Sequence, residues 1–449
     1  MEHFDVIVIG SGTAGYTAAH ACRKAGRSVL VVDKQPFGGT CAMRGCQPKK
    51  ILVAAAQAIH GTSALHGQGV DGESRLDWAA LMRFKRDFTY SVPERSEQGF
   101  LDAGIRTAHG LAVFSGPNQI RIEKKGYSAD KFIIAAGAVP RKLSVPGNEL
   151  LMDSDGFLEL DALPSSIAFI GGGFISFEFA HVCAQAGVRT TMIHRGKSFL
   201  RGFDPDLVTR LMEAGQAQGI SFLRESSVKQ IDQDEGGLTL HISGSDQQTL
   251  SVDKAVAAIG RVPDLADLGL DSAGVEHTPR GIKVNSFMQT SNPSIYAVGD
   301  VADTQHLLSP TADMEANTAA SNILRGNSVH ADYTAIPSVV FSIPALAAVG
   351  MSEEQAHAHA EQEGIQLMVN AGDASEWMSS RRIGQKHAAY KVILNESTGT
   401  ILGAHILGHN AGEMINIFAM AMKFGLTREQ LKSLLWAYPT HISDIKYML

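Results

Sequence analysis

The sequence of 449 residues has few of the features that mark secreted, membrane-bound and nucleic-acid-binding proteins. It contains only four cysteines and shows no charged-then-apolar leader, so we expect no disulfide scaffold and a reducing, cytoplasmic compartment. Its longest apolar runs, such as 6–9 and 54–56, are far shorter than the roughly 18 residues of a membrane-spanning helix. Lys and Arg total 39 and Asp and Glu total 46, a net charge of −7, which argues against a nucleic-acid partner.

Glycine is the residue in surplus. There are 45 glycines, about one residue in ten against an average near 7%. They follow no Gly-X-Y period and form no low-complexity segment, which excludes a collagen-like chain. Hydrophobic residues make up 44% of the chain, which excludes intrinsic disorder. At roughly 150 residues per domain, the length predicts about three domains, each with its own core.

The chain contains an internal repeat. Residues 7–34 and 168–195 each read as an apolar strand, a Gly-x-Gly turn, a helix ending in Ala-Gly, and a second apolar strand. Cys22 recurs at the equivalent place as Cys183, where we expect a small apolar side chain to pack on a sheet. This pattern is typical of the start of a dinucleotide-binding βαβ unit, and here it occurs twice.

Both copies have small residues at three fixed positions of the turn: Gly10, Gly12 and Gly15 in the first copy, and Gly171, Gly173 and Ser176 in the second. The first position lets the strand reverse tightly, and the second lets backbone N–H groups approach a pyrophosphate at the helix N-terminus. The third favours a small residue because strand and helix pack closely there. Two copies in one frame predict two nucleotide sites.

The end of the second strand predicts which nucleotide each copy binds. In the first copy it carries Asp33, an acceptor suited to ribose hydroxyls. The second copy has His194 at this place, followed by Arg195, Lys197 and Arg201, which lack an acceptor for a 2′-hydroxyl and suit a 2′-phosphate. The first site therefore suits a nucleotide without that phosphate, and the second suits NADP. The alternative is that the arginines are ordinary solvated charges.

Cys41 and Cys46 form a close pair after the first repeat. A regular helix would separate them by about 7.5 Å along its axis, more than the usual disulfide Cα–Cα limit of about 6.8 Å. If they pair, the first helical turn must be distorted, and the glycines at 38, 39 and 45 permit this. A disulfide in a reducing compartment is normally one that is repeatedly formed and reduced.

Over nearly its whole length the sequence resembles the flavin-dependent pyridine nucleotide–disulfide oxidoreductases, among them glutathione reductase, dihydrolipoamide dehydrogenase and mercuric reductase. The motifs that carry the resemblance are the GGTC-x4-C-x-P-x-K segment at 38–50, the Ala-Ala-Gly turn at 135–137, the flavin motif ending in Gly-Asp at 290–300, and the segments 340–344 and 348–350. The last two are similar to the opening of the family's dimerisation domain.

The resemblance implies an α/β fold with two Rossmann-like dinucleotide-binding domains and a C-terminal α+β dimerisation domain. Residues 1–145 and 261–330 would bind FAD, residues 146–260 would bind NADP, and residues 331–449 would form a homodimer interface. Because flavin motifs lie on both sides of the NADP motif, the FAD domain is expected to be discontinuous in sequence.

The resemblance also implies roles for single residues. Cys46 would lie against the flavin as the charge-transfer thiol, and Cys41 would attack the substrate. Lys50 would lie near the reactive flavin nitrogen with Glu178 as its ion-pair partner, although both could be surface charges. Phe174 falls where the family often has a tyrosine over the flavin. The expected cofactor-binding positions are Gly10, Gly12, Gly15, Asp33, Lys34, Gly39, Thr40, Lys50, Ala136, Gly137, Gly171, Gly173, Phe174, Ile175, Glu178, Arg195, Arg201, Gly260, Arg261, Gly299 and Asp300.

The C-terminal segment departs from the family pattern. Tyr438 stands where disulfide-reducing members have a catalytic histidine, and Ser443 stands in place of the glutamate that orients it. His441 and Asp444 could form a substitute acid–base pair with Tyr438 beside them, or His441 could simply cap or pack. Mercuric reductase also has tyrosine here, but its C-terminal cysteine pair is absent from this sequence.

We therefore expect an FAD-containing, NADPH-oxidising enzyme that cycles a Cys41–Cys46 disulfide and reduces a small disulfide. One alternative is a metal-ion reductase of mercuric type, acting on a thiophilic substrate. The other is a flavin-bound redox sensor with vestigial turnover, which the missing histidine–glutamate pair favours and the intact cysteine pair opposes.

Overall fold

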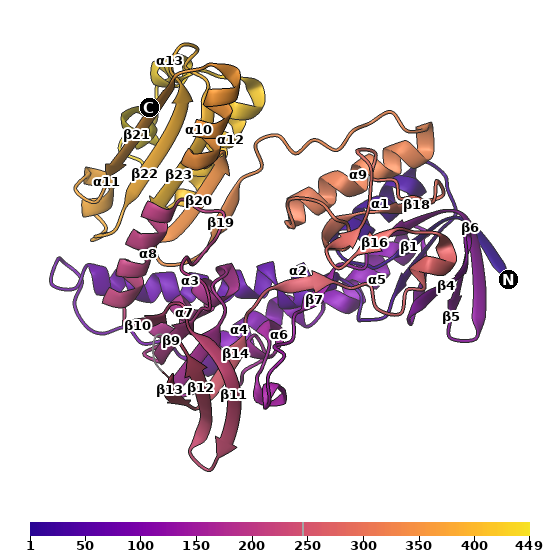
Figure 1. Cartoon of the computed structure of the whole chain (residues 1–449), viewed down its shortest axis with the longest axis horizontal. Coiled ribbons are helices and arrows are strands. Elements are labelled where there is room, and N and C mark those ends of the chain that lie inside the picture. The colour runs from indigo at the N-terminus through magenta and orange to yellow at the C-terminus, as the bar shows by residue number, and fades with distance from the viewer. Residues whose placement is uncertain (245–246) are drawn as a thin grey trace. The chain divides into compact units, whose positions relative to one another are not determined.

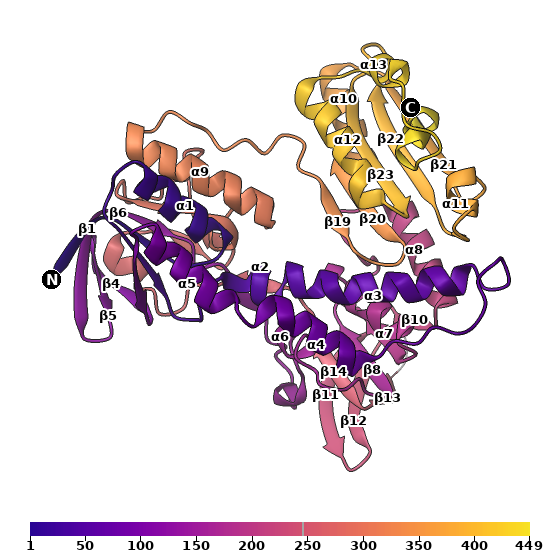
Figure 2. The ribbon, with the colours of Figure 1, turned by 180° about the vertical axis from the view of Figure 1, so that it is seen from behind.

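A computed structural model describes residues 1–244 and 247–449, and the chain divides into two compact units. Unit 1 comprises Met1–Lys49, Arg83–Arg141 and Arg261–Tyr333, and unit 2 comprises Lys50–Met82, Lys142–Gly260 and Thr334–Leu449. Two helices run across these limits, α3 (Cys46–Ala64) and α4 (Trp78–Thr89). Figures 1 and 2 show the elements from opposite sides.

Unit 1 is built on a seven-stranded sheet of order β3-β2-β1-β6-β5-β4, with β18 paired to β6. Its strands are β1 (Glu2–Ile9), β2 (Val29–Asp33), β3 (Arg106–His109), β4 (Ala112–Gly116), β5 (Gln119–Ile122), β6 (Lys125–Ile134) and β18 (Ile295–Ala297). The strands β3, β2, β1, β6 and β18 pair in parallel. The apolar run at the end of β1 is buried, as expected for a parallel sheet covered on both faces.

The helices of unit 1 are α1 (Thr13–Lys24), α2 (Gly39–Arg44), α5 (Val92–Asp102) and α9 (Ser309–Arg325), with short turns η2 (Leu270–Ala273) and η3 (Gly299–Val301). The helices α1 and α9 lie side by side (Figures 1 and 2). Two small ladders complete the unit: β7 (Ala138–Pro140) with β15 (Arg261–Pro263), and β16 (His277–Thr278) with β17 (Gly281–Ile282).

Unit 2 repeats the dinucleotide-binding pattern in a parallel sheet of order β10-β9-β8-β14. These strands are β8 (Ser166–Ile170), β9 (Arg189–Ile193), β10 (Ile220–Leu223) and β14 (Lys254–Ala257). A three-stranded antiparallel sheet joins them, formed by β11 (Ser227–Asp234), β12 (Gly237–Ser243) and β13 (Gln247–Val252). The helices of this part are α6 (Ser154–Phe157), α7 (Phe174–Gln185) and α8 (Pro205–Ala217), with η1 (Asn148–Leu150).

The C-terminal part of unit 2 is an antiparallel five-stranded sheet of order β19-β20-β23-β22-β21. Its strands are β19 (Ser338–Val340), β20 (Ala345–Gly350), β21 (Leu367–Asp373), β22 (Ala389–Asn395) and β23 (Ile401–Gly408). The helix α12 (Ala411–Phe424) packs on β20 and β23 (Figure 2). The remaining elements are α10 (Glu353–Glu363), α11 (Met378–Arg381), α12 (Ala411–Phe424), α13 (Arg428–Ser433), η4 (Ile442–Asp444) and α14 (Ile445–Met448).

The expected fold class is confirmed: two α/β dinucleotide-binding folds and a C-terminal α+β part are present. Cys22 and Cys183 pack in the cores beneath the two repeat helices, and both are fully buried. The three-domain boundaries stay a prediction, because the division into units joins the expected NADP and interface domains and adds residues 50–82 to them. No helix of the described residues is long and apolar enough to cross a membrane.

Candidate functional site

The first dinucleotide turn is shaped by close backbone approaches. Gly10 has φ +108°, and a Cβ added there would lie 2.2 Å from the carbonyl oxygen of Ala135. A Cβ on Gly15 would lie 1.9 Å from the oxygen of Gly10. Beside Gly12, the closest atom to such a Cβ is the Cα of Gly39, at 3.6 Å. The turn therefore excludes side chains where the backbones meet, and at Gly12 no side chain stands between the backbone N–H groups and a bound pyrophosphate.

Asp33 lies at the end of β2 and fixes this turn. One carboxylate oxygen accepts from the backbone N–H of Ser11 at 2.8 Å and from its hydroxyl at 2.6 Å, and the other accepts from the N–H of Gln35 at 2.8 Å. A carboxylate has about four acceptor sites, so Asp33 retains capacity for a ribose hydroxyl. Lys34 instead makes an ion pair with Asp264 at 2.9 Å.

The second turn reproduces the first. Gly171 has φ +136°, and an added Cβ would lie 2.1 Å from the oxygen of Ala258. Nothing lies within 4 Å of such a Cβ at Gly173, which precedes the first turn of α7 without a side-chain cap. Ser176, in the third position, is fully buried. Phe174 and Ile175 begin α7, and the ring of Phe174 is half exposed.

Positive charge gathers after β9, where the ribose-reading position lies. Burial lowers the pKa of His194, and the charges of Arg201 and Arg195 lower it further, so the imidazole is neutral at pH 7. Arg195 and Arg201 are exposed, and neither makes a hydrogen bond or ion pair with another described residue. These two guanidinium groups are therefore available to a phosphate.

The paired cysteines lie on either side of a helix break. The helix α2 ends at Arg44, Gly45 leaves the helical conformation, and α3 begins at Cys46. A Cβ on Gly45 would lie 2.9 Å from the oxygen of Thr40 and 3.3 Å from the Cα of Cys41. The distortion predicted from the cysteine spacing is present, and it rests on this glycine. Both residues are free thiols, and their side chains are hydrogen-bonded to each other.

The two sulfurs differ in charge. The hydrogen bond from Cys41 lowers the pKa of Cys46 to about 6, and the Ser309 hydroxyl and the Lys49 charge act in the same direction, whereas desolvation opposes them. The same hydrogen bond raises the pKa of Cys41, because its thiol is the donor. Cys46 is thus the thiolate and Cys41 the thiol at pH 7. Sequence reasoning missed Lys49, which adjoins Lys50, and missed Ser309, which no motif marks.

The turn expected to hold the flavin chain is supported by a buried carboxylate. Gly299 has φ +72°, and its N–H donates to Glu315 at 2.7 Å. The hydroxyl of Tyr333 donates to the other Glu315 oxygen at 2.8 Å. Burial raises the pKa of Asp300, and the charge of Arg261 opposes this effect. Glu315 is fully buried, and sequence reasoning did not single it out.

Three of the expected cofactor positions lie in turns that begin where strands end, namely Ala136, Gly137 and Gly260. Gly137 and Gly260 have φ +72° and +106°, where a side chain is strained. A Cβ on Gly39 would lie 2.4 Å from the Cα of Gly12, so the turn that opens α2 packs directly on the first dinucleotide turn.

Lys50 and Glu178 both contact Phe341 in unit 2. The Lys50 ammonium lies 3.9 Å from the centre of the Phe341 ring. The backbone N–H of Phe341 donates to the Glu178 carboxylate at 2.9 Å. Glu178 is 1% exposed, so it is not a surface charge on α7.

The C-terminal residues do not form the substitute acid–base pair expected from sequence. The carboxylate of Asp444 accepts a hydrogen bond from the Ser379 hydroxyl, and no bond joins it to His441 among the described residues. His441 packs against the ring of His409, 5.1 Å away, and burial is the main cause that lowers its pKa to about 4. Tyr438 is 71% exposed. The spacing of His441 and Asp444 suggested a hydrogen-bonded pair, but the Asp444 carboxylate is bonded to the Ser379 hydroxyl instead.

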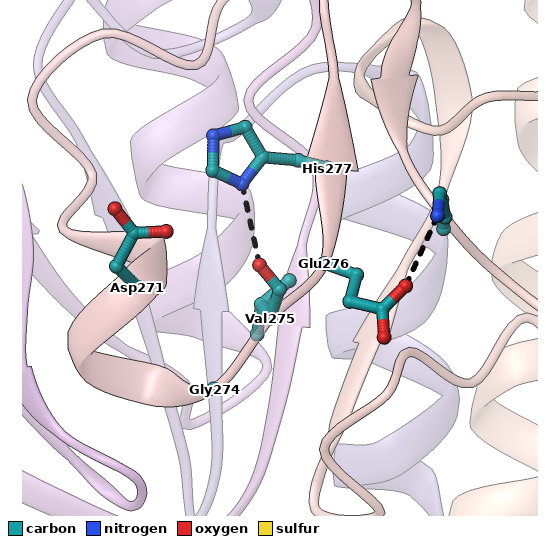
Figure 3. A pocket seen from close by; sticks show the side chains of 6 residues that line it. Asp271, Gly274, Val275, Glu276 and His277 are labelled. Atoms are coloured by element: carbon teal, nitrogen blue, oxygen red, sulfur yellow. Dashed lines mark hydrogen bonds and ion pairs between the residues drawn. The ribbon is translucent and has the colours of Figure 1, made fainter.

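A hollow on the surface of unit 1 lies apart from these residues (Figure 3). It is lined by Asp271, Gly274, Val275, Glu276, His277 and Lys283. Glu276 pairs with Lys283 at 3.1 Å, and the His277 ring contacts the Val275 oxygen at 3.2 Å. Glu276, Lys283 and His277 thus have partners within the hollow, and no sequence-predicted site residue lines it.

Comparison with known proteins agrees with this geometry. The family model described as pyridine nucleotide-disulphide oxidoreductase matches residues 4–321, and the model of its dimerisation domain matches residues 336–449. A glutathione reductase of Nostoc sp. is 32% identical over 99% of each chain, and one of Burkholderia cepacia is 34% identical over 97% of this chain and 96% of its own.

A solved structure is similar throughout. The Cu(II) complex of the HOCl-induced flavoprotein disulfide reductase RclA from Escherichia coli is 26% identical, with a TM-score of 0.90 over 100% of this chain and 99% of its own. The family combines a flavin with a pyridine nucleotide, in agreement with the two dinucleotide turns and the paired cysteines. The chain therefore belongs to the class I pyridine nucleotide–disulphide oxidoreductases, flavoprotein enzymes that act on sulfur groups.

Proposed function

We propose that this enzyme uses FAD and NADPH to reduce a small disulfide through Cys41 and Cys46. The observation that carries the proposal is the geometry of the pair: the helix break at Gly45 brings two free thiols together, their side chains are hydrogen-bonded to each other, and this bond lowers the pKa of Cys46. A thiolate held beside a thiol is the arrangement of a dithiol that exchanges with other disulfides.

The residues of unit 1 fit FAD. Gly12 carries no side chain that would block a pyrophosphate, Asp33 retains an acceptor site for a ribose hydroxyl, and Asp300 lies on the turn that Glu315 supports. Bound FAD would supply the transfer of an electron pair from the nicotinamide to the oxidised cysteine pair. The chain itself holds the phosphates on backbone N–H groups and places the thiols.

The exchange steps follow from the two thiols. Cys41 loses its proton and its sulfur attacks one substrate sulfur, forming a mixed disulfide and releasing the first substrate thiolate. The Cys46 thiolate then attacks the Cys41 sulfur, closing the Cys41–Cys46 disulfide and releasing the second thiolate. The substrate gains the two electrons that the cysteine pair loses. One proton comes from Cys41 and the other from solvent.

The preference for NADPH is proposed from Arg195 and Arg201 beside the second turn. Both arginines are exposed and have no partner among the described residues. A charge-assisted hydrogen bond contributes about 1.5–3 kcal/mol. The double variant Arg195→Ala, Arg201→Ala should therefore raise the KM for NADPH at least tenfold and leave the KM for NADH unchanged. Arg189→Ala, at the other end of β9, is the matched control. Equal flavin reduction by NADH and NADPH in the unaltered enzyme would refute this assignment.

The substrate class is tested by NADPH oxidation with glutathione disulfide, lipoamide and a panel of other small disulfides. We expect turnover with at least one of them, and Cys41→Ser should abolish it. Cys22→Ser, which changes a buried cysteine of α1, is the matched control and should retain activity. Turnover that survives Cys41→Ser would contradict the proposal.

A thiophilic metal ion is the second candidate substrate. His441 is neutral and buried, and Asp444 is bound to Ser379, so this segment supplies no histidine acid for a departing thiolate. A metal ion does not need one, and RclA has been solved as a Cu(II) complex. NADPH oxidation stimulated by Hg(II) or Cu(II) thiol complexes, with no response to any disulfide, would favour this candidate.

We further propose that the enzyme is a homodimer. The dimerisation domain of the family is present, and large apolar side chains are exposed on it, with Phe424 at 74% and Leu435 at 102% of their full accessible area. Light scattering after size-exclusion chromatography should give twice the mass of 47.9 kDa. A monomer mass at micromolar concentration would contradict this proposal.

A further inference from the structure

Lys391 connects the C-terminal sheet to α8, a helix that contacts β20 and β23 of that sheet (Figure 1). The ammonium of Lys391, on β22, lies 2.7–2.8 Å from three carboxylates, those of Asp204, Asp206 and Glu353. Burial opposes the charge of Lys391, but hydrogen bonds to these carboxylates outweigh burial and raise its pKa. Lys391 is therefore charged at pH 7, and three carboxylates match the three hydrogens of its ammonium group.

Asp204 is the carboxylate of this cluster that lies nearest in the chain to the second nucleotide site. Its side chain is 1% exposed, and it is the N-cap of α8. One of its oxygens accepts from the backbone N–H groups of Asp206 and Leu207, at 3.1 and 3.2 Å. The other oxygen lies 2.7 Å from the Lys391 ammonium. The N-cap is therefore held from two sides, by its own helix and by the C-terminal sheet.

The segment before Asp204 carries the two arginines that the proposed function assigns to the 2′-phosphate. Leu200 in this segment is buried, and its N–H donates to the carbonyl oxygen of Gly172, in the second dinucleotide turn, at 2.8 Å. A Cβ on Gly196 would lie 3.2 Å from a guanidinium nitrogen of Arg201, so this side chain folds back over its own segment. Arg201 thus lies between two fixed points of the backbone, Leu200 on one side and Asp204 on the other.

We propose that Lys391 is a positioning residue for the NADP site: by holding Asp204 it fixes the end of the segment from which Arg201 reaches the 2′-phosphate. Gly202, next to Arg201, has φ +101° and open space around an added Cβ. A glycine restrains the backbone little, so the order of this link depends on its two ends. The inference rests on the proposed function, in which the arginines select NADPH, and it makes the C-terminal sheet a contributor to that selection.

The test is the difference between NADP⁺ and NAD⁺ binding. Isothermal titration calorimetry on the FAD-loaded enzyme gives the Kd of each nucleotide. Lys391→Met should raise the Kd of NADP⁺ about fivefold, because part of one charge-assisted hydrogen bond to the phosphate is lost, and should change the Kd of NAD⁺ by less than about twofold. A general loss of stability would instead weaken the binding of both nucleotides alike.

Asp204→Asn breaks the same contact from the other side and serves if Lys391→Met folds poorly. Asparagine caps a helix about as well as aspartate, but its neutral amide does not pair with the Lys391 ammonium, so the same selective loss of NADP⁺ affinity is expected. Glu353→Gln is the matched control. It removes a carboxylate from the cluster, leaves the pair between Asp204 and Lys391, and should leave both Kd values unchanged.

A further variant separates positioning from charge. Without the Lys391 ammonium, three carboxylates are left uncompensated, and their charge alone would disfavour a phosphate nearby. The double variant Lys391→Met, Glu353→Gln removes one positive and one negative charge, so the net charge is kept while Asp204 is still released. Positioning predicts that this double variant keeps the loss of NADP⁺ affinity, and recovery of that affinity would overturn the inference.

The inference fails alone if the variant Arg195→Ala, Arg201→Ala loses NADP⁺ affinity selectively while the folded variants at Lys391 and Asp204 do not. An equal loss for NADP⁺ and NAD⁺ in those variants, or a selective loss in Glu353→Gln, also overturns it. Failure of the proposed NADPH preference has a different signature. In that case the unaltered enzyme binds NAD⁺ as tightly as NADP⁺, the arginine variant changes neither Kd, and the inference falls with the preference.

Discussion

His441 allows the chemistry of the C-terminal segment to be tested quantitatively. Its pKa of about 4 means that at pH 7 about one molecule in a thousand carries the imidazolium, and protonating it costs about 4 kcal/mol. A group so rarely protonated is a poor proton donor at neutral pH. His441→Gln should therefore leave disulfide turnover at pH 7 within about twofold of the unaltered enzyme.

The lowered pKa of His441 also predicts how the stability of the folded protein changes in acid. The pKa in the folded state lies below the ordinary value of 6.5, so between pH 6.5 and 4 the unfolded chain binds a proton that the folded chain excludes. The contribution of neutral His441 to the free energy of unfolding is therefore complete above pH 6.5. This free energy falls by about 3 kcal/mol as the pH is lowered from 6.5 towards 4. His441→Gln should remove this share of the acid sensitivity. His181 has a similarly lowered pKa, so acid sensitivity should remain in part.

Thermal unfolding at pH 7.5 and pH 4.5, together with NADPH oxidation from pH 5 to 9, checks both statements. His357→Gln, in the exposed face of α10, is the matched control. If acid lowers the melting temperature of His441→Gln as much as that of the unaltered enzyme, the burial argument fails. A loss of turnover above tenfold at pH 7, with Tyr438→Phe unaffected, would instead show that His441 transfers the proton.

Three further changes test the supports of the site. Gly45→Ala places a Cβ 2.9 Å from the Thr40 oxygen and should slow formation of the cysteine disulfide, measured by thiol titration, whereas Gly61→Ala has open space and should not. Glu315→Leu leaves the buried N–H of Gly299 without its acceptor, at about 1–3 kcal/mol, and should weaken FAD retention about tenfold in a flavin-release assay; unchanged retention would contradict its supporting role. Lys391→Met removes the cation held by Asp204 and two other carboxylates at 2.7–2.8 Å and should lower unfolding stability by about 3–5 kcal/mol; an unchanged melting temperature would refute this.

The turns were the most predictable part of the fold. Gly10 and Gly171 occupy positions where a backbone carbonyl lies about 2 Å from any Cβ, so only one residue type fits and the motif is visible in sequence. The break in the helix between the cysteines was also predictable, because a regular helix cannot bring two residues five positions apart into contact.

The side-chain partners were not predictable. Glu315 and Ser309 reach the site from α9, and nothing in their local sequence tells which turn or sulfur that helix will meet. His441 and Asp444 had the spacing of a pair, but the choice of partner was decided by Ser379, 65 residues earlier in the chain. Contacts of this kind depend on tertiary packing, which sequence spacing does not contain.

The backbone contact between Gly39 and Gly12 has a mechanical consequence. The segment that leads into the thiols rests on the loop expected to cradle FAD, with no side chain between them to absorb a displacement. Because the two backbones are in direct contact, a displacement of one loop also displaces the other. Loss of the nucleotide would therefore disturb the thiol-bearing helix α2 together with the dinucleotide turn.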